Sequence, residues 1–455
     1  MNATFFGDML QTIADRGRAL LERTLPGRLD AGTRSENLVE ECEQLLTGRG
    51  EASGVALARD ILNQYAALTI GPRIAFFEAL AGRFGPDQAR LTAAIAAWQD
   101  DRSETTTAEI HLAAEPRRQE LFRRLNLAPG GTAALVRMRE QLIDAMDHRD
   151  DLVAVDSDFV HLFSSWFNRG FLVLRRIDWS TPANILEKII KHEAVHKIRS
   201  WDDLRRRIEP ADRCCYAFFH PALGDEPLIF VEVALVREIA NAIAPILADK
   251  RESLDPERAK TAVFYSISNC QRGLAGVTFG HFLIKQVVEE ISRDNPRLST
   301  FVTLSPTPNF AEWLRRERGN EQSIVLDAED RMALENLDID GWWQQPDLRE
   351  QVEEPLMRAA AYYFLHARNP RGTPVDAVAR FHLGNGARLE QINFLGDTSE
   401  KGIEQAHGMM VNYLYDLDYI ERNHEAYAQN RTIAASNNVK RLVRTAPAEL
   451  VPVAS

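Results

Sequence analysis

His192, Glu193 and His196 have the spacing of the H-E-x-x-H motif of zinc peptidases. On a helix, two histidines in this arrangement bind one zinc ion while the glutamate activates a water molecule. The segment 185–198 has helical periodicity, which is compatible with this zinc-binding arrangement. However, no third histidine of the extended motif follows, and the next segment, WDDLRRRI, is densely charged. A structural surface helix is the favoured interpretation, and a zinc metallopeptidase is the alternative enzyme class.

A glycine-rich segment at 272–280 lies between a β-branched stretch at 261–267 and an amphipathic helical pattern at 279–291. This order presents free backbone N–H groups and the positive end of a helix dipole to an anion. Its glycines would allow a pyrophosphate to approach the backbone closely. The segment contains neither Gly-Lys-Ser/Thr nor G-x-G-x-x-G. An anion site and a tight turn packed on a sheet both remain open.

Ser305 follows an apolar stretch at 300–304, and Pro306 favours an extended conformation at Ser305. Asn309, with Glu312 three residues later, predicts a side-chain cap for a helix that begins there. The predicted strand therefore ends where Ser305 could face a cleft, although an ordinary loop serine would fit the same residues.

His382 lies just before the turn dipeptide Asn385-Gly386, which favours a sharp reversal of the chain. A histidine at this position can serve in proton transfer, but it can equally be a hydrogen-bonded core residue.

The bulk composition is that of a globular protein of two or three domains, with 455 residues, 45% apolar and 26% charged. A net charge of -12 argues against a dedicated nucleic-acid binder. The four cysteines form neither a disulfide framework nor a zinc ribbon. No apolar run approaches the roughly 18 residues that span a membrane, and the N-terminal segment lacks a signal-peptide core. A cytoplasmic location is expected.

The chain changes character near residues 165–175. Before this point, short amphipathic helices are predicted, separated by glycine and proline. After it, β-branched stretches alternate with helical patterns, which indicates a mixed α/β domain. The predicted strands are 171–174, 228–233, 261–267 and 300–304. We therefore predict a helical domain at 1–167 and a mixed α/β domain at 168–455.

Four segments, in the same order, resemble malonyl-CoA decarboxylases: YSISNCQRGLAGVTFGHFLIK, LSPTPNF, FHLGNGA and VNYLYDL. The likeness extends from about Trp166 to about Tyr419 and includes the EAVH segment of the zincin-like motif. It implies a helical domain that serves as scaffold or oligomer contact, followed by a catalytic domain of GNAT acetyltransferase-like fold. It also implies conversion of malonyl-CoA to acetyl-CoA and carbon dioxide, in fatty acid metabolism, by a homodimer or homotetramer.

The resemblance also implies the residues of the site. The catalytic residues would be Ser305 and His382, with Tyr415 near them as a substrate contact. The acyl-CoA loop would comprise seven consecutive residues: Ala275, Gly276, Val277, Thr278, Phe279, Gly280 and His281. Thr278 departs from relatives that carry glutamate, which puts a carboxylate's catalytic role there in doubt.

Decarboxylation would leave an enolate on the thioester oxygen, which backbone N–H groups near 269–276 could stabilise. Ser305 would hold the departing carboxylate out of the thioester plane, and His382 would protonate the α-carbon. No metal or cofactor beyond the substrate's coenzyme A is expected. Two further alternatives are a CoA-dependent acyltransferase of the same fold and a non-enzymatic acyl-CoA-binding protein.

Overall fold

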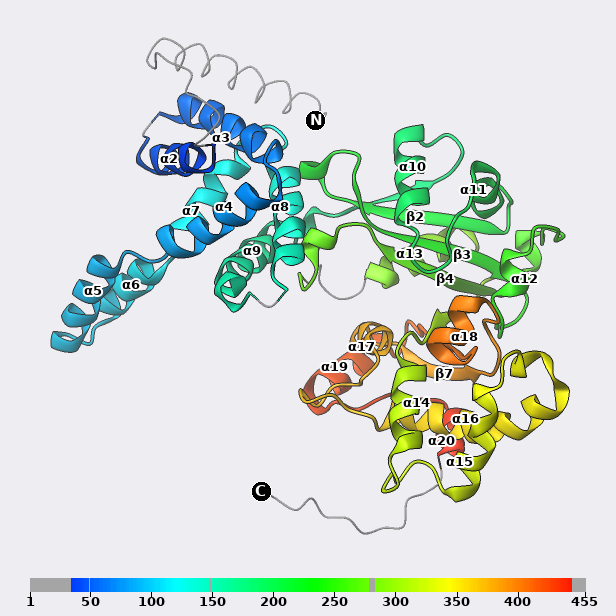
Figure 1. Ribbon diagram of the computed structural model, residues 1–455. Coiled ribbons are helices and arrows are strands. Elements are labelled where there is room, and N and C mark those ends of the chain that lie inside the picture. Colours follow the sequence, from blue (N-terminus) through cyan, green and yellow to red (C-terminus); the bar gives the residue numbers. More distant parts are fainter. Residues whose placement is uncertain (1–33, 49, 148, 278–282, 444–455) are drawn as a thin grey trace. The chain divides into compact units, whose positions relative to one another are not determined.

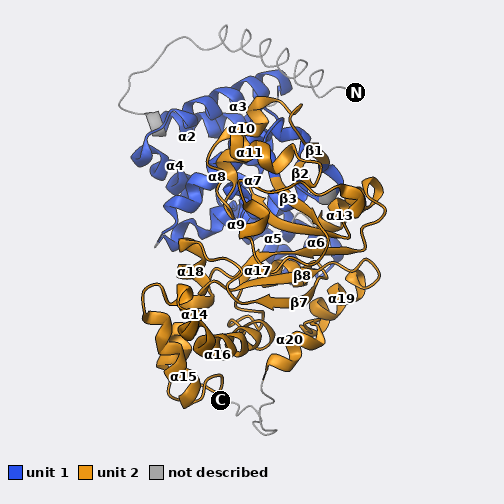
Figure 2. Ribbon diagram, turned by 90° about the vertical axis from the view of Figure 1, so that its right-hand side faces the viewer, with its two compact units in different colours: residues 1–173, 219–228, 271–279 blue, residues 174–218, 229–270, 280–455 orange. Residues whose placement is uncertain are grey.

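The computed structural model describes residues 34–443, except 49, 148 and 278–282. The chain forms two compact units, drawn in different colours in Figure 2. The first unit comprises residues 1–173, 219–228 and 271–279, and the second comprises 174–218, 229–270 and 280–455. The two units are not continuous in sequence, because the first unit also includes two short later segments. The predicted domain boundary after residue 167 therefore stays a prediction.

The first unit is helical, as expected (Figure 1). Its α-helices are α2 (Arg34–Thr47), α3 (Glu51–Ala66), α4 (Ile70–Arg83), α5 (Gln88–Asp100), α6 (Glu104–Ala114), α7 (Arg117–Asn126), α8 (Gly131–Ala145) and α9 (Val153–Trp166). Apolar residues on the inner faces form the core, in which the Phe122 and Phe159 rings stack with centroids 4.1 Å apart. The Arg118 guanidinium pairs with the buried Asp158 carboxylate beside them, so this charge is compensated.

The second unit is built on a mixed sheet in the order β1-β2-β3-β4-β5-β8-β6, with β7 also paired to β8. The strands are β1 (Val173–Ile177), β2 (Arg213–Phe219), β3 (Pro227–Val236), β4 (Thr261–Asn269), β5 (Thr300–Thr303), β6 (Ser305–Pro306), β7 (Arg388–Asn393) and β8 (Met410–Leu414). The later three predicted strands are confirmed. The strand predicted at 171–174 forms instead at Val173–Ile177. The fold is therefore mixed α/β with a helical N-terminal region, as expected.

Helices of the second unit lie between and after these strands (Figure 1). They are α10 (Ala183–His192), α11 (Trp201–Ile208), α12 (Ala244–Leu247), α13 (Leu283–Asp294), α14 (Phe310–Gly319), α15 (Ala328–Leu334), α16 (Pro346–Leu365), α17 (Ala377–Gly384), α18 (Glu400–Ala406), α19 (Ile420–Asn430) and α20 (Asn437–Leu442). One face of the sheet carries a buried apolar cluster that includes Val263, Val302, Leu304 and Met410. Burial of this cluster stabilises the central strands.

All four cysteines lie in the described part of the chain and are buried, and none of them forms a disulfide. Within that same part, no helix combines the length and the apolar character that a membrane crossing requires.

Candidate active site

The zincin-like segment does not have the geometry that its spacing suggested. Helix α10 ends at His192, and Glu193 has an extended backbone with ψ 104°. The prediction that 185–198 is helical is therefore wrong beyond His192. The physical reason lies in the Glu193 carboxylate, whose Oε1 accepts the backbone N–H groups of Val195 (2.8 Å) and His196 (2.6 Å). These bonds stabilise a turn in place of another helical turn.

The remaining oxygen of Glu193 ties this turn to β4. Its Oε2 accepts hydrogen bonds from the hydroxyls of Ser266 (2.7 Å) and Ser268 (3.2 Å). The carboxylate is thus buried with both oxygens occupied, unlike a glutamate that activates water. No group of three or more His, Cys, Asp or Glu residues suited to hold a metal ion occurs among the described residues.

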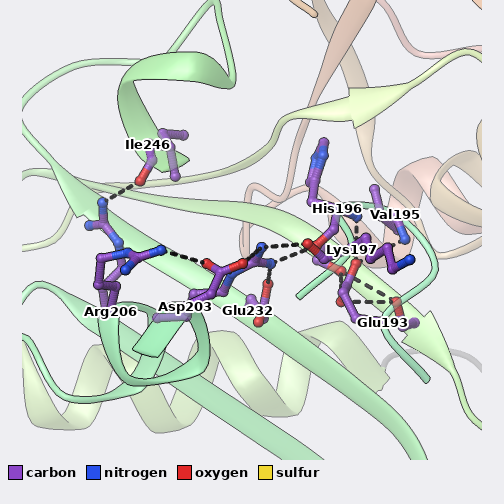
Figure 3. A network of polar contacts seen from close by, with 12 residues as sticks. Glu193, Val195, His196, Lys197, Asp203, Arg206, Glu232 and Ile246 are labelled. Atoms are coloured by element: carbon purple, nitrogen blue, oxygen red, sulfur yellow. Dashed lines mark hydrogen bonds and ion pairs between the residues drawn. The ribbon is translucent and has the colours of Figure 1, made fainter. Parts of the chain in front are cut away.

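A buried ion pair supports the same turn (Figure 3). The Arg207 guanidinium donates to the carbonyl oxygen of His196 (2.8 Å) and to Oε2 of Glu232 (3.0 Å). Burial raises the pKa of Glu232, the adjacent Arg207 guanidinium opposes that shift, and burial lowers the pKa of His196 to about 4. The segment is therefore a structural element anchored on the sheet.

The first half of the glycine-rich segment belongs to the helical unit. Gly276 has φ +77°, a left-handed conformation that favours glycine. A Cβ on Gly273 would lie 1.9 Å from the carbonyl oxygen of Val136 on α8, so only glycine fits there. Ala275 and Val277 are described as well, whereas Thr278, Phe279, Gly280 and His281 lie outside the described residues. The role of the whole loop in acyl-CoA binding stays a prediction.

Arg139, which the sequence did not single out, holds this half of the loop. Its Nη1 donates to the carbonyl oxygens of Gly273 (2.9 Å) and Ala275 (2.7 Å), while its Nε donates to Oδ1 of Asp156 (2.8 Å). The guanidinium is buried. Arg139 and Gly273 are 134 positions apart, so no local sequence pattern indicated this contact.

We expect Arg139→Met to destabilise the helical unit by about 3 kcal/mol, because Asp156 and two carbonyl groups lose their partner. If the loop binds acyl-CoA, KM for malonyl-CoA should also rise several-fold. Chemical denaturation and steady-state kinetics measure the two effects. The matched control is Arg137→Met, an exposed arginine on the same helix. Equal behaviour of the two variants would contradict the role of Arg139.

Ser305 lies where two parallel strands diverge. Strands β4 and β5 pair from Thr261↔Thr300 to Phe264↔Thr303. Beyond that point β4 remains paired with β3, whereas the chain after β5 stays paired with β8, with Ser305 opposite Val411 as Val302 is opposite Leu414. Ser305 is buried and does not itself line a described cavity. The next three residues, Pro306 to Pro308, line a cavity of about 190 Å³ together with residues 194–196, 401–402 and 405–406.

The divergence brings Ser305 to His382. Ser305 Oγ lies 3.2 Å from Nε2 of His382, and Nδ1 of His382 lies 2.7 Å from the hydroxyl oxygen of Tyr415. Ser305 also donates a hydrogen bond to Oγ1 of Thr303 (2.8 Å). Three of the predicted site residues thus form one continuous hydrogen-bonded chain within the second unit, and Thr303 extends it.

His382 is held in the last turn of α17. Asp376 caps the start of this helix by accepting the N–H of Ala379 (2.7 Å). The expected reversal follows the helix, with Gly386 at φ +80°. The imidazole stacks on the Tyr413 ring, with centroids 4.6 Å apart. Its position is therefore fixed by a helix end, a strand and an aromatic ring.

Complete burial sets the protonation state of this chain. Burial lowers the pKa of His382 to about 3, so its imidazole is neutral at neutral pH. Burial also raises the pKa of Tyr415 far above its usual range, so the phenol retains its proton. Ser305, His382 and Tyr415 are therefore buried and uncharged at neutral pH.

The predicted cap on the following helix is wrong in one respect. Asn309 does occupy the N-cap position of α14, but its side chain makes no capping hydrogen bond. Its backbone, at φ -109° and ψ 6°, lies outside the extended region that directs a capping side chain towards the helix.

Thr303, which bonds Ser305, and Tyr413, which stacks on His382, are two residues of the site that the sequence reasoning missed. A signal for both was present, since side chains two residues apart on a strand share one face. Thr303 precedes Ser305 by two positions, and Tyr413 precedes Tyr415 by two.

The fold is mixed α/β, and the second unit holds a buried hydrogen-bonded chain of Ser305, His382 and Tyr415. Comparison with known proteins identifies the family of this chain. Residues 84–167 match the family model of the malonyl-CoA decarboxylase N-terminal domain, and residues 170–452 match that of the malonyl-CoA decarboxylase C-terminal domain.

The crystal structure of malonyl-CoA decarboxylase from Rhodopseudomonas palustris is 58% identical, covering 90% of this chain and 99% of that one, with a TM-score of 0.88. The corresponding structure from Agrobacterium vitis is 56% identical, covering 89% and 99%, with a TM-score of 0.86. The mitochondrial malonyl-CoA decarboxylase of Anser anser anser is 36% identical over 84% of this chain and 82% of its own. The chain belongs to the malonyl-CoA decarboxylase family.

Proposed function

We propose that this chain converts malonyl-CoA to acetyl-CoA and carbon dioxide at the site formed by Ser305 and His382. The observation that supports it most directly is the neutral, buried His382, with one ring nitrogen 3.2 Å from Ser305 and the other 2.7 Å from Tyr415. Malonyl-CoA is the proposed substrate because the chain belongs to the malonyl-CoA decarboxylase family.

The reaction requires that the substrate is held in one orientation and that one proton is delivered to its α-carbon. The bond between the α-carbon and the carboxylate breaks, carbon dioxide leaves, and the electron pair moves to the thioester oxygen as an enolate. His382 then gives its Nε2 proton to the α-carbon, forming the methyl group of acetyl-CoA. Because His382 starts as a neutral imidazole, this step leaves an imidazolate. In another enzyme, a neutral imidazole polarises a substrate carbonyl. Solvent restores the imidazole proton after the products leave.

Ser305 positions the substrate in this proposal. The Ser305 hydroxyl lies next to Nε2 of His382 and donates to Thr303 in the absence of substrate. A substrate carboxylate that replaces Thr303 as the acceptor of this hydrogen would have its α-carbon near the proton donor. Orientation of the breaking bond perpendicular to the thioester plane lets the electrons enter the carbonyl system. Because the thioester accepts these electrons, the proposal includes neither a metal nor an organic cofactor. Residues 275–281 are proposed to bind the coenzyme A portion.

The test is release of carbon dioxide from malonyl-CoA by the purified protein, with and without a strong chelator, with acetyl-CoA quantified in parallel. Equal amounts of the two products, unaffected by the chelator, are expected. Release that the chelator abolishes would overturn the metal-free mechanism. Turnover that requires an amine acceptor would favour an acyltransferase, and saturable binding without turnover would favour a binding protein.

A cytoplasmic location and a homodimer or homotetramer also belong to this proposal. The acidic composition and the compact buried core agree with a protein that works in aqueous solution. The animal relative described above is named as mitochondrial, so fractionation of the source cells is the relevant measurement of location. Light scattering of the purified protein measures the assembly, and a monomer would contradict it.

A further inference from the structure

We propose that Thr303 is a positioning residue that selects the Nε2–H tautomer of His382 by accepting the hydroxyl hydrogen of Ser305. Only the expected effect on catalysis rests on the proposed function. The tautomer itself can be measured without turnover.

The Thr303 hydroxyl is held in place from two directions. Its Oγ1 accepts the backbone N–H of Tyr413 (3.1 Å) and the hydroxyl of Ser305 (2.8 Å). The Tyr413 N–H belongs to strand β8, whose position is fixed by its neighbours in the sheet. Thr303 is completely buried, so no solvent molecule competes as the acceptor for Ser305.

A count of hydrogens then fixes the rest of the chain. Ser305 has one hydroxyl hydrogen, which it donates to Thr303. The 3.2 Å contact between Ser305 Oγ and His382 Nε2 must therefore use a hydrogen on Nε2. A neutral imidazole has only one N–H group, so Nδ1 carries none and accepts the hydroxyl of Tyr415 at 2.7 Å.

Every donor in the chain consequently points the same way, from Tyr415 through His382 and Ser305 to Thr303. This polarity matters because the atom facing Ser305 carries the proton that an acid must deliver. With the opposite polarity, Ser305 would donate to a bare Nε2 atom, and the proton of His382 would face Tyr415. That arrangement activates a serine as a nucleophile, which is a different reaction class. Thr303 thus favours protonation of carbon over attack by serine.

Thr303→Val tests the idea with little change in side-chain shape. The valine removes the acceptor, so we expect Ser305 to donate to Nε2 and the proton of His382 to move to Nδ1. Nuclear magnetic resonance of protein labelled with ¹⁵N-histidine separates the two tautomers, because protonated and bare ring nitrogens have well-separated shifts. The signals of His382 are those lost in His382→Gln. Thr303→Ser, which retains the hydroxyl, should retain the wild-type tautomer.

Kinetics supply the second readout. We expect Thr303→Val to lower kcat for malonyl-CoA by about 10²-fold, the lower end of a general acid's contribution, with KM little changed. Thr303→Ser should recover most of the activity. Thr300→Val, on the same strand, is the matched control and should behave as the wild type. Recovery by serine separates this role from a general loss of stability, which thermal unfolding of each variant monitors.

A wild-type spectrum with the proton on Nδ1 would overturn the inference without any variant. An unchanged tautomer in Thr303→Val would overturn it as well. The proposed function can fail separately. If the wild type releases no carbon dioxide but shows the Nε2–H tautomer that Thr303→Val reverses, the role of Thr303 stands and the assigned reaction is wrong.

Discussion

Replacement of His382 by alanine is expected to lower kcat for malonyl-CoA decarboxylation by about 10²–10⁴-fold, the contribution of a positioned general acid. The imidazole is the group next to Ser305 that can supply a proton, at 3.2 Å between Oγ and Nε2. Alanine also leaves the hydroxyl of Tyr415 without its acceptor. Binding of coenzyme A should be retained, because the predicted loop at 275–281 is unchanged. Steady-state kinetics and calorimetric binding measure the two effects.

The matched control is His161→Ala, an exposed histidine on α9 of the helical unit. It should leave both kcat and binding unchanged. Near-full turnover in His382→Ala would contradict the assignment of the acid. A parallel loss of binding and of folding cooperativity would point instead to a structural role for the stacked imidazole.

The pH dependence of the wild type distinguishes which form of His382 is the acid. Burial lowers its pKa to about 3, so the neutral imidazole persists at every pH well above that value. If the neutral form donates the proton, kcat should be nearly flat between about pH 5 and 9. An imidazolium acid would instead lose activity tenfold per pH unit throughout that range. A profile with that slope would contradict the neutral-acid mechanism.

Replacement of Ser305 by alanine is expected to lower kcat by about 10²-fold while coenzyme A binding is kept. Ser305 stands between Thr303 and His382, at 2.8 Å and 3.2 Å, so its loss interrupts the chain of hydrogen bonds at its centre. The substrate carboxylate would also lose the group proposed to hold it out of the thioester plane. Rapid-quench measurement of a single turnover reports this step separately from product release.

Ser157→Ala, on an exposed face of α9, is the matched control, since its hydroxyl bonds only a carbonyl of its own helix. Unchanged kinetics in Ser305→Ala would remove Ser305 from the mechanism. A covalent acetyl or malonyl group on Ser305, detected by mass spectrometry of quenched wild-type enzyme, would show that the serine is a nucleophile and not a positioning group.

Local patterns in the sequence predicted much of the fold. Helical spacing of apolar residues predicted the helices of the first unit, and β-branched stretches predicted β3, β4 and β5. These features depend on residues within a few positions of one another, so periodicity and side-chain shape are sufficient to identify them. The resemblance to malonyl-CoA decarboxylases then supplied a substrate that no local pattern contains.

The HEAVH segment shows where local information fails. The spacing of His192 and His196 is compatible with a helix, but Glu193 bonds Ser266 and Ser268, more than 70 residues away. Those contacts, together with the turn that Glu193 closes, outweigh the helical preference of five residues. A distant partner of this kind is invisible to periodicity.

The sequence by itself determined the classes of helix and strand, the family, and the candidates Ser305, His382 and Tyr415. Only the tertiary structure decided that these three form one chain, because Ser305 and His382 are separated by 77 positions. The divergence of β4 from β5 places Ser305, the last turn of α17 places His382, and the neighbouring strand β8 leads into Tyr415. The neutral state of His382 and the direction of its hydrogen bonds were likewise decided by burial and by Thr303, since both depend on groups that meet only when the chain is folded.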